Sequence, residues 1–436
     1  MTNSQTATPD RTLAIVGQGY VGLPLAMAAV DAGWSVIGVE KSTARVAQLN
    51  SGSSPVEDIS DERLAKAIAA KKYFASTNPA DISAALFVTI CVPTPLDSAR
   101  NPDLELLENA TKDIAPFLRD GTLLVNESTS YPGTLRDVII PIVNSSKPSE
   151  TKSLYFASAP ERVNPGDLVW DQKNTPRLIG GIDEESQKRA LAFYNSICDS
   201  VVATSTPEIA EAAKILENTF RLVNISLINE FTQLCSAQGI NVHEVINAAA
   251  TKPYGFMPFR PGVGIGGHCI PVDPLYLAWR ARVAGVPARF VELAGEINAD
   301  MPFHVVTALE AALRRGRGKG LAGSRILVLG AAYKPGIEDV RESPALRLME
   351  LIERQGGEAP YYDPLVPALP AQAEHPGLAG RCSLPWAEAL ACDAALIVTD
   401  HDGIDYAGLC DAMPLVVDTR DACARRGLRG RNIVKA

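Results

Sequence analysis

A glycine-rich turn between two short apolar runs constrains the fold of this chain more than any other feature. Residues 12–16 are apolar and lead into the turn Gly-Gln-Gly-Tyr-Val-Gly at 17–22, and residues 23–32 predict a helix. A second apolar run covers residues 35–39 and ends at Glu40. Strand, glycine turn, helix, strand and acid in this order predict a dinucleotide-binding unit, with an ordinary glycine-rich turn as the alternative.

The three glycines have separate physical tasks in such a unit. Gly17 allows the tight turn, Gly19 lets backbone N–H groups approach a pyrophosphate, and Gly22 lets helix and strand pack closely. The N-terminus of the helix then offers its N–H groups to the anion. The intervening Tyr20 and Val21 are expected to line the same cofactor site.

Glu40 predicts which cofactor this unit takes. It lies 18 residues after Gly22, where a carboxylate accepts a hydrogen bond from the ribose 2′-hydroxyl and repels a 2′-phosphate. This arrangement favours NAD over NADP. The positive charge of Lys41 opposes that preference, and both residues belong to the expected cofactor site.

The alternation of strands and helices continues after this unit. Residues 86–92 and 122–125 have the character of strands, and residues 104–118 between them predict a helix. This rhythm is typical of a parallel sheet with helices on its faces.

The middle of the chain is expected to be helical, at residues 207–237, 242–249 and 290–315, and to carry a dimer interface. The segment 314–324, rich in Gly, Arg and Lys, predicts a linker to a second α/β unit. The strands of that unit are expected at 325–330, 359–362, 394–398 and 415–417, and its helix at 344–354.

Composition excludes several classes of protein. The formal net charge is −9, so bulk attraction to nucleic acid or to an anionic membrane is not expected. The 8 cysteines include no Cys-x-x-Cys pair, which argues against a zinc ribbon, a redox dithiol and a disulfide scaffold, and no metal site is expected. Residues 1–12 lack the apolar core of a secretory signal, and no apolar run reaches the roughly 18 residues of a membrane span. The sequence therefore indicates a cytoplasmic protein.

One cysteine lies in an unusual setting. The segment 260–273 holds four glycines together with His268, Cys269 and Asp273. Such a loop lets backbone amides line a ligand, and a cysteine at its end is presented rather than buried. His268 and Asp273 are expected to tune the thiolate, and backbone amides at a loop or helix start are expected to lower the pKa of the thiol, which makes Cys269 the candidate nucleophile. A simple hydrogen bond within the loop is the alternative role of His268, and the other seven cysteines are small core residues by default.

A nicotinamide site and a presented cysteine together indicate aldehyde oxidation through a covalent thiohemiacetal. Lys214 and Asn218 lie four residues apart on one predicted helix, and their ammonium and amide groups suit a developing oxyanion. Glu161, in the turn-rich segment 159–166, is placed to act as the base that activates water. A solvated helix face and an ordinary loop glutamate are the alternatives.

The second α/β unit has only one glycine, Gly330, at the phosphate position of its first turn, so a second dinucleotide fingerprint is absent. Lys334 and Arg341 follow that turn, and both are suited to hold a phosphate-bearing substrate. Ordinary surface charge is the alternative.

In this order the motifs resemble the UDP-glucose/GDP-mannose dehydrogenase family of nucleotide-sugar 6-dehydrogenases. The resemblance runs from Gly17 to about Thr419. Its marks are the turn at 17–22, Val-Pro-Thr-Pro at 92–95, Glu-Ser-Thr at 127–129 with Pro-Gly at 132–133, Pro-Glu-Arg at 160–162, Lys214 with Asn218, residues 266–274, Tyr-Lys-Pro at 333–335 and Arg-Glu-Ser-Pro at 341–344.

The resemblance implies an NAD-dependent, four-electron oxidation of a sugar C6 hydroxyl to a carboxylate with two NAD⁺ in succession. Cys269 would attack the C6 aldehyde, a second hydride transfer would give a thioester, and water would release the uronic acid. Lys214 and Asn218 would stabilise the oxyanion, Glu161 would assist the hydrolysis, and Asp273 would orient water or Lys214.

The resemblance also implies the binding residues and an assembly. Arg260 matches a loop that in relatives reaches a nucleotide diphosphate in a neighbouring subunit, and members usually form dimers or higher assemblies on their central helices. The implied cofactor positions are Gly17, Gly19, Tyr20, Val21, Gly22, Glu40, Lys41, Thr94, Thr129 and Arg341, and the implied substrate positions are Glu161, Arg162, Lys214, Asn218, Arg260, Gly266, His268, Tyr333 and Lys334.

Pattern and resemblance together predict an α/β protein with two Rossmann-like doubly wound domains joined by a central helical region. The NAD-binding domain is expected at 1–204. A helical connector and dimerisation region with the cysteine loop is expected at 205–318, and a UDP-sugar-binding domain at 319–436.

The substrate is expected to be a UDP-N-acetylhexosamine, because residues 252–260 and the Gly-Gly-His-Cys-Ile-Pro form resemble that branch of the family. The residues Phe-Met-Pro-Phe at 256–259 and Ile-Pro at 270–271 favour UDP-N-acetylglucosamine. UDP-glucose, UDP-N-acetylmannosamine and a non-catalytic regulator that binds NAD and a nucleotide sugar are the alternatives. Val263 stands where relatives often carry a proline, and this substitution is expected to loosen the loop.

Overall fold

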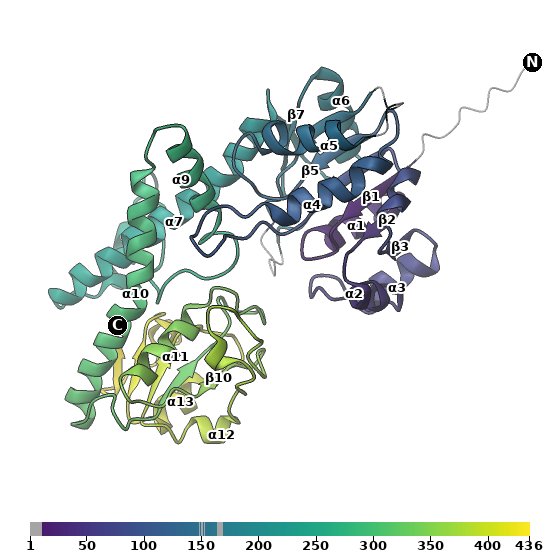
Figure 1. Cartoon of the computed structure of the whole chain (residues 1–436). Helices are drawn as coiled ribbons and strands as arrows, with labels where there is room; N and C mark the ends of the chain where they lie inside the picture. Colours follow the sequence, from purple (N-terminus) through teal and green to yellow (C-terminus); the bar gives the residue numbers. More distant parts are fainter. Residues whose placement is uncertain (1–10, 148, 150, 152, 164–168) are drawn as a thin grey trace, which may run out of the picture. The chain divides into compact units, whose positions relative to one another are not determined.

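The computed structural model describes residues 11–147, 149, 151, 153–163 and 169–436. The chain forms two compact units (Figure 1). The first extends to Glu217 and includes Leu275–Gly285, and the second comprises Asn218–Pro274 and Val286–Ala436. The three-domain boundaries predicted from the sequence stay a prediction.

The first unit is built on an eight-stranded sheet in the order β3-β2-β1-β4-β5-β6-β7-β8. Neighbouring strands are parallel except β6 and β7, which are antiparallel. The predicted parallel sheet is therefore confirmed, but the antiparallel pairing of β6 with β7 was not predicted from the sequence. The strands are β1 (Thr12–Val16), β2 (Ser35–Val39), β3 (Tyr73–Ser76), β4 (Phe87–Ile90), β5 (Leu123–Asn126), β6 (Tyr155–Ser158), β7 (Arg177–Gly181) and β8 (Val201–Ala203).

Helices connect these strands, and side-chain caps fix where several of them begin. Ser42 accepts a hydrogen bond from the N–H of Arg45 at the start of α2, and Asp183 accepts one from Ser186 at the start of α6. Such caps satisfy backbone donors that a helix leaves without internal partners. The helices are α1 (Gly22–Asp31), α2 (Thr43–Asn50), α3 (Asp61–Ala69), α4 (Glu105–Ile114), α5 (Ile140–Ser146) and α6 (Glu184–Tyr194).

Two helices contain residues of both units. They are α7 (Pro207–Ala237) and α9 (Asp273–Val283). The helix predicted at 207–237 is thus confirmed with its bounds, whereas α9 was not predicted. Helix α9 was missed because a glycine-rich segment precedes it and because Pro274 is its second residue. Proline is in fact favoured in the first turn of a helix.

The second unit is a doubly wound parallel sheet in the order β10-β9-β11-β12-β13. Apolar residues of α10 and α11 cover one face, and those of α13 cover the other. The elements are α8 (Val242–Ala249), α10 (Arg289–Arg317), β9 (Ile326–Leu329), α11 (Pro344–Arg354), β10 (Tyr361–Tyr362), α12 (Trp386–Ala389), β11 (Ala394–Ile397), α13 (Tyr406–Ala412), β12 (Val416–Asp418), α14 (Ala422–Arg425) and β13 (Ile433–Lys435).

The linker predicted at 314–324 is wrong for its first four residues, which belong to α10, whereas residues 318–324 form the connection to β9. Helix α10 continues to Arg317 and ends at Gly318, which has a left-handed φ of 69°. Leu321 is buried, and its N–H donates a hydrogen bond to the carboxylate of Glu310 in α10. The glycines of this segment terminate a helix, and the leucine packs the chain into the core of the second unit.

Among the helices of the described residues, none combines the length and apolar character that crossing a membrane requires. The predicted signal-free start, residues 1–12, falls almost entirely outside the described residues.

Candidate active site

The glycine turn after β1 has the geometry of a phosphate cradle. Gly17 has a φ of 94°, and a Cβ there would lie 2.4 Å from the carbonyl oxygen of Cys91. A Cβ at Gly22 would lie 1.9 Å from the carbonyl oxygen of Gly17. A Cβ at Gly19 would meet no atom within 4 Å. Two glycines are therefore required by packing, while the third leaves open space above its backbone, which fits a dinucleotide pyrophosphate.

Glu40 lies beside this turn at the end of β2. Its Oε2 accepts a hydrogen bond of 3.1 Å from the N–H of Gln18, and its Oε1 accepts one of 3.0 Å from Ser42. These bonds hold the carboxylate where a ribose hydroxyl would bind, and they fit NAD. Lys41 and Tyr20 are exposed at the same edge of the sheet.

Thr94 and Thr129, expected at the cofactor site, are brought together. The Thr94 hydroxyl donates to the carbonyl oxygen of Thr129 at 2.6 Å, and the Ser128 hydroxyl donates to the carbonyl oxygen of Val92 at 2.8 Å. The loops after β4 and β5 are thereby tied at the carboxyl ends of neighbouring strands, next to the glycine turn of β1. Ligands of open α/β sheets bind at this edge.

A buried ion pair between Glu127 and Arg177 supports this edge, and the sequence analysis assigned no role to either residue. The Glu127 carboxylate accepts a hydrogen bond of 2.8 Å from Arg177 and a second from the Tyr194 hydroxyl. Burial raises the pKa of Glu127, and Arg177 and Tyr194 oppose that rise. Removing one partner of such a pair leaves a buried charge uncompensated, so the network fixes the turn that leads to Ser128.

Glu161 and Arg162 follow β6 in the same unit. The N–H of Glu161 donates to the carbonyl oxygen of Glu127, and its carboxylate accepts from the N–H of Val163. Arg162 forms two hydrogen bonds, of 2.6 and 3.2 Å, with the Glu217 carboxylate. Its guanidinium is thus engaged with the protein. Residues 164–166, the end of the predicted turn-rich segment, lie outside the described residues.

Helix α7 carries both Lys214 and Asn218, as predicted, and both side chains are buried. The predicted alternative of a solvated helix face is therefore wrong. The Asn218 amide donates to the Asp273 carboxylate at 2.5 Å, and Asp273 is itself buried. This bond fixes the orientation of the Asn218 amide, because its carbonyl oxygen then points away from Asp273.

Cys269 is exposed, at the end of the glycine loop and four residues before Asp273, where α9 begins. The N–H of Asp273 donates to the carbonyl oxygen of Cys269 at 2.8 Å. The backbone of Cys269 is therefore tied to the first residue of α9. Burial, and then the charge of Arg341, lower the pKa of His268. A neutral imidazole supplies no positive charge, so the expected help of His268 to the thiolate is not supported.

Side chains from distant parts of the second unit hold the cysteine loop. Asn229 of α7 accepts from the N–H of Gly262 at 3.0 Å, and Asn298 of α10 accepts from that of Ile265 at 2.6 Å. The sequence analysis missed both asparagines, because neither lies in a local motif. Their contacts join residues far apart in the chain.

The loop glycines are explained by packing as well as by ligand access. A Cβ at Gly267 would lie 2.8 Å from the Tyr333 ring, and one at Gly266 would lie 2.7 Å from the carbonyl oxygen of Glu342. Val263 is 1% exposed and belongs to the core of the second unit. The side chain of Val263 therefore anchors the loop in that core, and the expected loosening relative to a proline stays a prediction.

Of the other predicted site residues in the second unit, Arg341 contacts the cysteine loop, whereas Arg260 is bonded to Asn247. The carbonyl oxygen of Arg341 accepts from the N–H of Gly267 at 2.9 Å, and its guanidinium pairs with Asp339. The Lys334 ammonium lies 5.8 Å from the Tyr333 ring centre. Burial, and then Asp339, raise the pKa of Tyr333 to about 12. Arg260 is exposed and donates to Asn247 at 2.7 Å.

The phosphate position of the second sheet is filled by the protein itself. Asp363, at the end of β10, accepts hydrogen bonds of 2.7 and 3.0 Å from the N–H groups of Ala331 and Ala332, directly after Gly330. Burial opposes ionisation of Asp363, but His401 and the backbone donors hold its pKa below the usual value. The Asp363 carboxylate therefore accepts the hydrogen bonds that these amides would otherwise donate to a dinucleotide phosphate.

An α/β chain with an open glycine cradle, a ribose-directed carboxylate and a presented cysteine falls in the class of NAD-dependent oxidoreductases. Sequence models of the UDP-glucose/GDP-mannose dehydrogenase family match the chain in three consecutive parts. They are the NAD binding domain at 11–198, the central domain at 208–300 and the UDP binding domain at 327–425. The chain belongs to this family and is an NAD-dependent nucleotide-sugar 6-dehydrogenase.

Individual relatives agree over nearly the full length. The UDP-N-acetyl-D-mannosamine dehydrogenase of Pyrococcus horikoshii is 33% identical over 429 residues, which cover 97% of this chain and 96% of that protein. The enzyme of the same name from Escherichia coli K12 is 34% identical over 89% of this chain and 93% of its own. The structure of UDP-D-ManNAc dehydrogenase from Pyrococcus horikoshii superposes with a TM-score of 0.86 at 32% identity, covering 97% of this chain and 98% of its own.

A buried glutamate in α7 predicts a pH-dependent stability. Glu211 accepts hydrogen bonds from the N–H groups of Gly133 and Leu135, at 2.7 and 3.2 Å, in the turn that follows Thr129. Burial raises the pKa of Glu211 to about 7, against 4.5 for an ordinary glutamate. The folded state therefore binds this proton more tightly. Its stabilising contribution is complete below pH 4.5 and is lost as the pH rises through 7, on the order of 3 kcal/mol in all.

We expect Glu211→Gln to lose less stability than the natural chain between pH 5 and pH 8, measured by urea unfolding at both values. Glu208→Gln is the control one turn away. Burial acts to raise the pKa of Glu208, but the hydrogen bond and charge of Arg136 together with the other hydrogen bonds to this carboxylate lower it, so its contribution does not change in that range. Equal losses of stability in the Glu211 variant and the natural chain would contradict the assignment.

Proposed function

We propose that this chain oxidises the C6 hydroxyl of UDP-N-acetyl-D-mannosamine to the uronate through a covalent intermediate on Cys269. The observation that carries the proposal is the exposure of Cys269, four residues before α9 begins. Asp273, the first residue of that helix, is buried and accepts a hydrogen bond from Asn218. A thiol in this setting is reactive, while its surroundings are rigid.

The choice of sugar follows the relatives. Those described above are named UDP-N-acetyl-D-mannosamine dehydrogenases. They fit one of the alternatives of the sequence analysis, and they do not support its preference for UDP-N-acetylglucosamine. The proposed substrate is therefore still a UDP-N-acetylhexosamine, but with the manno configuration at C2 in place of the gluco configuration.

In the proposed chemistry the chain's residues act on the sugar carbon in sequence. Two NAD molecules, bound in succession beside Gly17, Gly19, Gly22 and Glu40, would each supply a hydride acceptor for one of the two oxidations at C6. After the first, the Cys269 thiolate adds to the C6 aldehyde and forms a C–S bond, and Lys214 and Asn218 stabilise the negative oxygen. Loss of the second hydride leaves a thioester. Water, activated by Glu161, then breaks the C–S bond and releases the carboxylate with return of the thiol.

Cofactor and substrate residues follow the same proposal. The backbone of Gly17, Gly19 and Gly22 would hold the pyrophosphate of NAD, and Glu40 the ribose. The remaining cofactor residues are Tyr20, Val21, Lys41, Thr94, Thr129 and Arg341. The substrate residues are Glu161, Arg162, Lys214, Asn218, Arg260, Gly266, His268, Tyr333 and Lys334.

A substrate and cofactor panel tests the sugar and the role of Glu40. We expect NADH formation with UDP-N-acetylmannosamine to exceed that with UDP-N-acetylglucosamine and UDP-glucose in kcat/KM, and NAD to be preferred to NADP because Glu40 repels a 2′-phosphate. The product is expected to be the uronate by mass spectrometry. A higher kcat/KM for either other sugar, or for NADP, would refute the corresponding assignment.

Cys269→Ala is expected to abolish uronate formation, because no thioester forms, while NAD still binds with its natural affinity. Product mass spectrometry and NAD titration measure the two effects. Cys382→Ala is the matched control, since Cys382 is also exposed but lies far from Cys269 in the chain, between β10 and α12. Complete oxidation to the acid by the Cys269 variant would rule out the covalent route.

We propose that a second copy of the chain covers an apolar face of the helical region. Leu227 and Leu234 of α7, and Phe290 and Leu293 of α10, are between 53% and 78% exposed. Large exposed apolar patches are typical of interfaces. Sedimentation is expected to give at least twice the chain mass of 46.5 kDa, and Leu227→Glu to lower that mass. A natural chain that sediments as a monomer would contradict the proposal.

A further inference from the structure

A buried histidine at the edge of the second sheet joins a carboxylate to a backbone amide. His401 follows β11, and it is only 1% exposed. Its Nδ1 accepts a hydrogen bond of 3.2 Å from the N–H of Gly336, and its Nε2 lies 3.0 Å from the Asp363 carboxylate. Because Nδ1 accepts, the proton of the neutral ring lies on Nε2, which donates it to Asp363.

Asp363 and His401 together hold the two ends of the segment 333–335. The Asp363 carboxylate accepts from the two N–H groups directly before the segment, at 2.7 and 3.0 Å, and His401 accepts from that of Gly336 directly after it. Gly336 is exposed and has no side chain that could pack. Its hydrogen bond to the buried ring therefore anchors this end of the segment.

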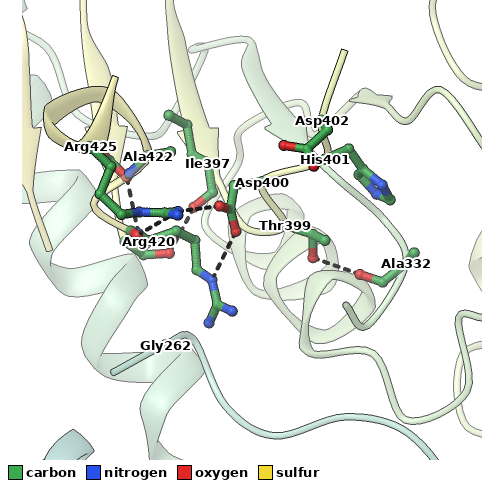
Figure 2. Close-up of polar contacts among 12 residues, drawn as sticks. Gly262, Ala332, Ile397, Thr399, Asp400, His401, Asp402, Arg420, Ala422 and Arg425 are labelled. Atoms are coloured by element: carbon green, nitrogen blue, oxygen red, sulfur yellow. Dashed lines mark hydrogen bonds and ion pairs between the residues drawn. The ribbon is translucent and has the colours of Figure 1, made fainter. Parts of the chain in front are cut away.

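The strand end that carries His401 is itself fixed. The carbonyl oxygen of His401 accepts from the Tyr406 hydroxyl at 3.2 Å. The Thr399 hydroxyl, two residues before His401, donates to the carbonyl oxygen of Ala332 at 2.6 Å, and Figure 2 shows this bond together with the histidine ring. The buried ring is therefore a rigid support for an exposed stretch of backbone.

The segment 333–335 contains two of the residues assigned above to the substrate. The ring of Tyr333 lies against the cysteine loop, where a Cβ at Gly267 would be 2.8 Å from a ring carbon, and Lys334 is the next residue. A ligand that binds to a segment already held in place does not have to order it, so less conformational entropy is lost on binding. The anchor at Gly336 therefore bears on the affinity for the nucleotide.

We propose that His401 is a positioning residue for the nucleotide site of the second unit, and that it acts by holding the N–H of Gly336 through Nδ1. Asp363 fixes the tautomer, since it accepts the proton of Nε2 and leaves Nδ1 as an acceptor. The roles of Tyr333 and Lys334 rest on the proposed function, whereas the match to a UDP binding domain at 327–425 does not. UDP alone is therefore a suitable probe.

Two amide variants separate the hydrogen bonds of the two ring nitrogens. In His401→Asn the side-chain oxygen can take the place of Nδ1 and accept from Gly336, while the bond to Asp363 is lost. In His401→Gln the side-chain nitrogen can take the place of Nε2 and donate to Asp363, while the bond to Gly336 is lost. Asp363 keeps four backbone donors in both variants.

Calorimetric titration with UDP measures the effect on the site. His401→Gln is expected to raise the Kd for UDP by about fivefold or more, because the freed segment must be ordered on binding. His401→Asn is expected to keep the natural Kd to within about twofold, since its anchor is retained. His401→Ala, which removes both bonds, should match the glutamine variant in Kd. Thermal melting verifies that each variant is folded.

Amide hydrogen exchange measures the anchor without any ligand. Peptides that cover residues 333–340 are expected to exchange about threefold faster or more in His401→Gln than in the natural chain, because the N–H of Gly336 is no longer bonded. His401→Asn should exchange at the natural rate. His375→Gln is the matched control, since it removes an Nδ1 hydrogen bond of 2.9 Å to Glu350 from another histidine of the same unit. It is expected to leave both the exchange and the Kd for UDP unchanged.

Turnover adds a test that rests on the proposed function. His401→Gln is expected to raise KM for the nucleotide sugar with kcat near its natural value, because the segment binds the ground state and the transition state alike. If the natural chain oxidises none of the sugars, the proposed function fails. The UDP titration and the exchange rates then still decide the role of His401.

Two results would overturn the inference. An equal rise of the Kd for UDP in His401→Asn and His401→Gln would show that the bond to Gly336 is not the one that matters. A natural Kd in His401→Gln, whether or not Gly336 exchanges faster, would show that the anchor does not serve the nucleotide site.

Discussion

The close approach of other residues to the backbone of the cysteine loop is the constraint on which the rest of the second unit's site depends. The ring of Tyr333 lies against Gly267, and the carbonyl oxygen of Glu342 lies against Gly266. Such approaches are possible only where Cβ atoms are absent. The glycines suggest a flexible loop in the sequence, but in the structure they allow other residues to hold the loop at several points. A nucleophile must be held in a defined position to react efficiently.

The two α/β units show how one architecture can take different ligands. Both place a carboxylate near the amides of the first turn, from Glu40 in the first unit and Asp363 in the second. In the first unit Gly19 leaves open space, whereas in the second Asp363 accepts from the two amides that follow Gly330. The position of one carboxylate thus distinguishes a dinucleotide cradle from a turn that is already satisfied.

Much of the fold was predictable because it depends on local pattern. The bounds of β1, β2, α7, α8 and α11 follow from apolar runs and helix signals within a few residues of each end. The antiparallel strand β7, the packing of Leu321 and the anchoring of Val263 were not predictable in this way. Each is decided by what lies beside the residue in space.

The sequence alone determined the dinucleotide cradle, the acid beside it, the shared helix of Lys214 and Asn218, and the exposure of Cys269. These features need only residues that are neighbours in the chain, since turns, helices and strand ends are local structures. The default that the other seven cysteines are core residues is wrong for Cys382, which is exposed. Only the tertiary structure decided that Asn218 bonds to Asp273, that Asn229 and Asn298 hold the loop, and that His401 bonds to Gly336. Those contacts join residues separated by 33 to 65 positions, and burial and packing alone bring them together.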